Sequence, residues 1–143
     1  MFSDKITYED FNGNTQTKEV FFNLSKMEAL ALDSEGPEGY AKKLQAVADE
    51  GDMIQILDAF KDIVKKAYGV KSEDGKRFIK SDEEFAKFEE SPAYDEFMMK
   101  LITEEDYALD FILGALPSVE GVTKDSVLKD VKLANMLGTG DNN

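Results

Sequence analysis

The stretch MIQILDAFKDIVKKA, residues 53–67, decides the fold. Its apolar residues recur at intervals of three or four, namely Met53, Ile56, Leu57, Phe60, Ile63, Val64 and Ala67. Because an α-helix makes one turn about every 3.6 residues, this spacing places all of them on one face. The stretch therefore predicts an amphipathic helix at the centre of the core. Gly69 follows it and is predicted to cap its end.

The N-terminal part of the chain has the pattern of strands instead. Residues 5–9 alternate between polar and apolar side chains, and residues 17–24 are rich in β-branched and aromatic ones. The sequence Asn-Gly-Asn at residues 12–14 lies between them and is typical of a turn. These features predict a β-hairpin over residues 5–24. Its apolar face would carry Ile6, Tyr8, Val20, Phe22 and Leu24. An isolated hairpin is only marginally stable in water, so we expect it to dock on helices.

Further helices are predicted where a capping residue precedes an apolar periodicity. These stretches are residues 25–32, 37–50, 81–88, 91–102 and 103–116, followed by a thinner apolar stripe over 122–137. Ser25 with Glu28, and Ser81 with Glu84, have the spacing of capping boxes. Thr103 is predicted to cap the stretch that it opens. After a turn at residues 72–75, residues 77–79 are predicted to be extended.

Together these patterns predict an α+β protein that is mainly α, with an N-terminal β-hairpin docked on a bundle of about five to seven short helices. We expect one domain over residues 1–137, with the hairpin at 5–24 and helices within 25–137. Residues 138–143 form a polar tail with no apolar side chain to bury.

The composition argues against most enzyme classes. The 143 residues include no Cys and no His, which removes thiol nucleophiles and the commonest general base near neutral pH. The chain has 30 acidic and 17 basic residues and a net charge of -13, so nucleic acid is a poor partner. No stretch has the roughly 20 apolar residues of a membrane span, and residues 1–10 lack a signal-peptide pattern. We therefore expect a cytosolic protein that binds other proteins, with no catalytic, cofactor-binding or metal-binding residues.

Two acidic clusters have the residue type that glycoside hydrolysis or metal binding requires. Asp82, Glu83 and Glu84 follow a capping Ser, and residues 104–106 follow the capping Thr. The dipole of a helix favours negative charge at its first turn, so helix stabilisation explains both clusters. A hydrolase that uses only carboxylates is the alternative, and replacing Asp82, Glu83 and Glu84 by Ala would abolish its activity.

Asp10, Asn12 and Asn14 occupy the first, third and fifth positions of a calcium-binding loop. The pattern then fails, because Thr15 replaces the required Gly and Phe21 replaces the bidentate Glu. The hairpin turn explains these residues better.

Two features are candidates for protein binding. The basic residues concentrate in one region, at Lys61, Lys65, Lys66, Lys71, Lys76, Arg77 and Lys80. They form either a solvated surface or a contact for an acidic partner or a neighbouring copy. Met98 and Met99 lie beside Phe97, and flexible Met side chains suit a surface that accepts varied apolar sequences. One of the two is expected in the core, which leaves the other for a partner.

The chain as a whole resembles the tail assembly chaperones of long-tailed bacteriophages, in particular those of Gram-positive hosts. Three stretches carry the resemblance: TYEDFNG at residues 7–13, FFNLSKME at 21–28 and AYGVKSEDGKRFIKS at 67–81. Their order and spacing cover residues 5 to 117. None of the three is a catalytic signature, so the resemblance concerns the overall layout of the chain.

The resemblance implies a protein that binds and solubilises the tape measure protein and is displaced when the tail tube polymerises. Its implied partners are the tape measure protein, the tail tube protein, other copies of itself and a longer frameshifted form. It would act in the host cell cytoplasm and be missing from the mature virion. We expect the apolar surface for this client on the helices between Tyr94 and Leu116. The predicted contact residues are Phe97, Met98, Met99, Phe111 and Ile112.

A second function is compatible with the acidic charge. An acidic phage protein can imitate DNA and occupy a host nucleic-acid enzyme. Such a mimic needs its carboxylates in a stripe at phosphate-like spacing, whereas here they scatter through helix starts and loops among many lysines.

Overall fold

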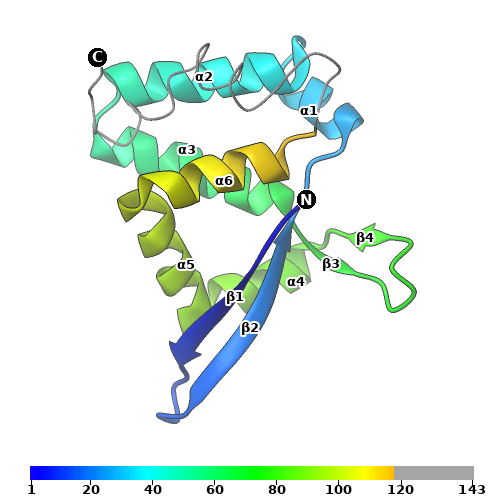
Figure 1. Ribbon diagram of the computed structural model, residues 1–143, viewed down its shortest axis with the longest axis vertical. Helices are drawn as coiled ribbons and strands as arrows, with labels where there is room; N and C mark the ends of the chain where they lie inside the picture. The colour runs from blue at the N-terminus through cyan, green and yellow to red at the C-terminus, as the bar shows by residue number, and fades with distance from the viewer. Residues whose placement is uncertain (118–143) are drawn as a thin grey trace.

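The computed structural model describes residues 1–117, so the predicted helix at 122–137 and the polar tail at 138–143 lie outside the described residues. The elements are β1 (Phe2–Glu9), β2 (Thr15–Phe22), α1 (Lys26–Leu32), α2 (Gly36–Glu50), α3 (Met53–Ala67), β3 (Tyr68–Lys71), β4 (Phe78–Ile79), α4 (Asp82–Glu89), α5 (Pro92–Thr103) and α6 (Glu105–Ala115). The predicted class is confirmed: the chain is α+β and mainly α, with an N-terminal hairpin followed by helices (Figure 1).

The hairpin has the predicted turn and the predicted apolar face. Asp10 makes the turn, because its carboxylate oxygen Oδ1 accepts the N–H groups of Asn12 and Asn14, each at 2.9 Å. The antiparallel register then sets Tyr8 opposite Gln16 and Ile6 opposite Lys18. The predicted inward residues Ile6, Val20, Phe22 and Leu24 are buried, and Tyr8 is half-buried. The strands begin earlier than expected, at Phe2, whose ring also lies on this face.

Two short strands extend the hairpin into a sheet with the order β1-β2-β3-β4. The predicted extended segment at residues 77–79 contains β4. The prediction that Gly69 caps the central helix is wrong, because α3 ends at Ala67 and Gly69 lies in β3 opposite Phe21. A side chain at position 69 would collide with the ring of Phe78. Glycine is therefore needed for the close packing of β3 against β4, and the positive φ of a glycine cap plays no part.

Side-chain caps define several helix starts. The box between Ser25 and Glu28 is confirmed, and a second one, between Asp52 and Gln55, starts α3. Only half of the box predicted at Ser81 forms, since its side chain accepts the N–H of Glu84 without a reciprocal bond. Thr103 does not cap α6, because it is the last residue of α5 and its hydroxyl donates to the carbonyl of Met99 at 2.7 Å.

An aromatic cluster joins the sheet to the helices. Phe22 is fully buried, and its ring stacks on that of Phe97 with centroids 4.8 Å apart. The rings of Phe2, Tyr68, Phe88 and Phe111 also contact Phe22, at centroid distances between 5.2 and 6.2 Å. The predicted central helix adds Phe60, Ile63, Val64 and Ala67 to this core. The core is thus built from both ends of the described chain.

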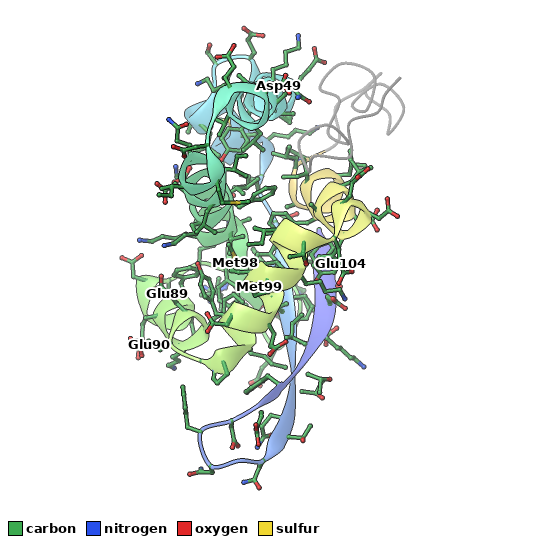
Figure 2. All side chains as sticks on the ribbon, turned by 90° about the vertical axis from the view of Figure 1, so that its left-hand side faces the viewer. Asp49, Glu89, Glu90, Met98, Met99 and Glu104 are labelled. Carbon is green, nitrogen blue, oxygen red and sulfur yellow. The ribbon has the colours of Figure 1, made fainter. Side chains whose placement is uncertain are left out.

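The helices leave the turn end of the hairpin uncovered. In both views its turn extends away from them, at the lower end of the picture (Figures 1 and 2). Helices α5 and α6 pack against β1, and α4 packs against β3 and α5. Helices α2 and α3 lie together at the opposite end of the molecule (Figure 1). Within residues 1–117, no helix is long and apolar enough to cross a membrane.

Candidate interaction site

The structure separates the five predicted contact residues. Phe97 and Phe111 are fully buried, and Met98 and Ile112 are exposed by only 6% and 1%. These four side chains form the core between α5, α6 and the sheet, so they are not available at the surface. Met99 is 57% exposed. Met98 and Met99 are both labelled on α5 in Figure 2, and their exposed fractions show that Met98 is turned into the core and Met99 outward.

Met99 lies in a surface hollow of about 470 Å³ between β1 and α5. Its lining residues are Lys5, Ile6 and Thr7 from β1, and Glu96, Met99, Lys100, Thr103 and Glu104 from α5 and its end. We call this the β1–α5 hollow. Its lining combines the Met99 thioether with charges of both signs. Such a surface has an apolar contact point and a polar rim, which is the usual anatomy of a protein interface.

The sequence contains a signal for this surface, but apolar periodicity alone does not reveal it. Glu96, Met99, Lys100 and Thr103 have the spacing i, i+3, i+4 and i+7, which places them on one face of a helix. The core-facing residues Ala93, Phe97, Met98 and Leu101 share the other face. Met99 is thus the apolar member of a polar stripe. That stripe, and not the apolar one, is the surface available to a partner.

The second wall of the hollow is an open strand edge. The N–H of Asp10 donates to the carbonyl of Asn14 at 2.8 Å, just beyond the last pair of the β1–β2 register. Because hydrogen-bonded pairs alternate in an antiparallel ladder, even-numbered residues of β1 direct their backbone groups to β2. Lys5 and Thr7 therefore direct their amide and carbonyl groups away from β2, and both residues line the hollow. Among the described residues, no strand pairs with this edge.

One polar cluster beside the hollow joins β1 to α5 and α6. The Tyr107 hydroxyl of α6 donates to the carboxylate oxygen Oδ2 of Asp4 at 2.6 Å, and Lys100 Nζ lies 3.7 Å from the same oxygen. Lys100 also lies 4.3 Å from the centroid of the Tyr107 ring. Burial of Tyr107 raises the pKa of its hydroxyl, and the Asp4 carboxylate raises that pKa further. The tyrosine is therefore a permanent hydrogen-bond donor that ties β1 to α6.

Replacing Tyr107 with Phe removes this donor and leaves the aromatic packing in place. We expect the free energy of unfolding to fall by about 1 to 2 kcal/mol, because a half-buried carboxylate loses a charge-assisted hydrogen bond. Urea denaturation measures the change. Tyr8→Phe is the matched control, since Tyr8 is also half-buried and its hydroxyl has no hydrogen-bond partner in the described chain. Equal stability losses in the two variants would contradict the role given to Tyr107.

Much of the predicted basic concentration is engaged within the described chain. Lys66 pairs with Asp62 and Lys80 with Glu28, each at 2.8 Å, and Lys71 Nζ lies 4.6 Å from the centroid of the Phe21 ring. The Lys80 ammonium and the N–H of Ser25 lower the pKa of the Glu28 carboxyl, against the opposing effect of burial. A smaller hollow of about 260 Å³ is lined partly by Lys65, Lys66 and Lys80, but Asp82 lies beside them. These contacts favour a solvated surface that also supports the fold.

The two predicted carboxylate clusters lie at the first turns of α4 and α6, where the helix dipole favours negative charge. Asp82, Glu83 and Glu84 form the first turn of α4, and Glu84 pairs with Lys87 at 3.3 Å. The predicted calcium-loop residues form the hairpin turn, where hydrogen bonds from Gln16 and from backbone N–H groups lower the pKa of Asp10. Within residues 1–117, no group of three or more acidic residues is arranged to hold a metal ion.

Large apolar side chains other than Met99 are also exposed, but they are dispersed over the molecule. They are Met1, Phe11, Met27, Leu30, Met53 and Ile54. Phe11 is at the hairpin turn, Met27 and Leu30 lie on α1, and the pair at residues 53–54 begins α3. Met99 differs from them in its place, because it lies in a hollow beside an open strand edge.

The family comparison covers this whole arrangement. A family model described as phage tail assembly chaperone matches residues 1–124. Comparisons with curated proteins and with solved structures found no match. The matched stretch includes β1 and α5, so both walls of the β1–α5 hollow belong to the part of the chain that the family defines.

Proposed function

Because the chain belongs to the phage tail assembly chaperone family, we propose that its client is the tape measure protein, which it keeps soluble until the tail tube polymerises. The family supports a role in tail assembly and is in general not enzymatic. The proposal adds the identity of the client and the manner of its release. The β1–α5 hollow carries the proposal, because it offers Met99 as an apolar contact inside a charged rim.

The exposed apolar surface suits weak binding by many copies. Met99 is a single apolar contact, and the four predicted companions are occupied in the core. One copy therefore gains little free energy from a client helix. Many copies on one long client gain much more, because each further copy binds at a high effective concentration. A cover of this kind remains tight as a whole and can still be removed copy by copy.

The charge of the chain supports both solubility and release. A net charge of -13 on each copy gives the covered client a highly charged exterior. Neighbouring copies repel one another over distances up to about 8 Å at physiological salt. This repulsion lowers the free energy needed to remove them when tail tube subunits arrive. The tail tube protein, other copies and a longer frameshifted form are the further partners of this scheme, and the host cytoplasm is its site.

Co-expression with the tape measure protein from the same phage genome tests the proposed client. We expect the soluble fraction of the tape measure protein to rise several-fold and the two proteins to co-purify. A second apolar helical protein of similar length serves as the control for general solubilisation. If the tape measure protein stays insoluble although the chaperone is folded, as circular dichroism would verify, the client assignment is wrong.

A further inference from the structure

The outer edge of β1 is built to accept another strand. Its eight residues contain no proline and pair without interruption with β2. The odd-numbered residues Ser3, Lys5, Thr7 and Glu9 direct their backbone groups away from β2, by the alternation derived above. Within residues 1–117, the Lys5 N–H donates to the adjacent Asp4 carboxylate at 2.8 Å, and no strand pairs with the backbone groups of this edge. An open edge of this length is a template for strand pairing.

The charges along this edge are complementary to those of the same edge in a second copy of the chain. Lys5 and Glu9 are both exposed, lie on the same face of β1 and are four positions apart, with Thr7 midway. If two such strands run antiparallel about a two-fold axis at Thr7, Lys5 of each copy lies opposite Glu9 of the other. Opposite charges in directly facing positions stabilise an antiparallel pair. A register shift of two residues in either direction sets Lys5 opposite Thr7 or Phe11, and both ion pairs are lost.

We propose that two copies of this chain pair through the outer edges of their β1 strands, in the register centred on Thr7. The pairing joins two hairpins into a continuous sheet and is isologous, so it closes as a dimer. It concerns the chain alone and does not depend on which client it binds.

The inner face of the added strand meets the β1–α5 hollow. In the proposed register Ile6 of one copy lies opposite Tyr8 of the other, and Tyr8 is only half-buried in the single chain. Neighbouring strands are about 4.8 Å apart, so the added strand enters the hollow in which Met99 lies. The tip residue Phe11, 86% exposed in the single chain, then lies beside Ser3 of the other copy. Pairing thus covers apolar surface at both places and competes with any client for Met99.

The large negative charge does not prevent this arrangement. Antiparallel pairing sets the bases of the two hairpins at opposite ends of the joined strands, while α5 of each copy stays beside residues 5–7 of its own β1. From Thr7 to Phe2 is five residues at about 3.3 Å each, so the two bases of the hairpins are roughly 33 Å apart. This separation is several times the screening length of about 8 Å at physiological salt. Asp4 does face Asp10 of the other copy, but Tyr107 and Lys100 hold the Asp4 carboxylate, and turn amides hold that of Asp10.

Analytical ultracentrifugation of the purified full chain at physiological salt tests the charge pattern. We expect a reversible dimer whose dissociation constant rises at least tenfold in Lys5→Glu and in Glu9→Lys. The double variant, which has the charge of the natural chain, is expected to restore dimerisation. Lys61→Glu, an exposed charge reversal on α3, should leave it unchanged. A chain that is monomeric at every concentration overturns the proposal and leaves the edge to a client strand. Equal effects of Lys5→Glu and Lys61→Glu overturn it as well.

A crosslink tests the register itself. The chain has no natural Cys, so one introduced Cys reports on its own surroundings. At the two-fold axis the facing Cα atoms are about 5.5 Å apart, within the range for a disulfide. We expect Thr7→Cys to form a disulfide-linked dimer under mild oxidation. Ser3→Cys lies on the same exposed edge but far from its counterpart, so it should not crosslink. Crosslinking of Ser3→Cys without Thr7→Cys would overturn the proposed register.

Discussion

Replacing Phe22 with Ala is expected to lower the free energy of unfolding by about 3 to 5 kcal/mol. Phe22 is fully buried at the junction of β2 with α4, α5 and α6. Its ring stacks on Phe97 and meets four other rings. Removing it opens a cavity that rigid aromatic neighbours cannot fill. A loss of this size is comparable with the total stability of many domains.

Phe21→Ala is the matched control for this prediction. Phe21 is the adjacent residue of the same strand, but its side chain points to the opposite face and is only half-buried, with Lys71 over its ring. We expect its removal to cost less than about 1.5 kcal/mol, through a lost cation–π contact and little buried area. Urea denaturation followed by circular dichroism measures both variants. Similar losses for Phe21→Ala and Phe22→Ala would mean that the aromatic cluster does not hold the sheet to the helices.

Elements with local signals were predictable from the sequence. The apolar period of residues 53–67 depends on neighbours within one turn, and α3 has those bounds. The box between Ser25 and Glu28 satisfies backbone groups three residues apart, so it too is a local signal. Asp10 accepts two amides of its own turn. In each case the stabilising partner lies within a few residues, which is the range that a sequence pattern reports.

Elements that depend on distant partners were not predictable. β3 is only four residues long, and Gly69 is extended because it pairs with Phe21 of the hairpin. Phe2 was missed because Asp4 interrupts the apolar alternation of its strand. Asp4 is tolerated on the inner face because Tyr107, 103 residues away in the chain, donates to its carboxylate. No local pattern contains that contact.

At the candidate site, too, local patterns were predictable and contacts between distant residues were not. Helical spacing identified the apolar faces of α5 and α6, but it does not tell whether an apolar face meets solvent or the rest of the protein. The packing of α5 on β1, α4 and α6 covers Phe97 and Met98. Met99 remains outside because it is one residue, and therefore about 100° of helix rotation, beyond Met98. The choice between the two Met residues required the position of the neighbouring strand.

Replacing Met99 with Gln is expected to weaken client binding roughly five- to twentyfold for each contact, because full burial of an exposed Met side chain contributes about 1.5 to 3 kcal/mol and only slightly over half of Met99 is left to bury. Gln keeps the length and the helix propensity of Met, and residue 99 is 57% exposed, so the free energy of unfolding should stay within about 0.5 kcal/mol of the natural chain. The loss multiplies over the copies on one client. Co-expression with the tape measure protein should therefore yield little soluble client.

Met53→Gln is the control that makes this result specific. Met53 is also a surface Met on a helix, exposed by 65%, but it lies at the start of α3, away from the β1–α5 hollow. If binding depends on the hollow, Met53→Gln retains the soluble yield and Met99→Gln loses it. If it depends on surface Met in general, both variants lose it to a similar extent. A Met99→Gln variant that is folded and fully active would place the client on another surface, because no other exposed apolar side chain within residues 1–117 lines the hollow.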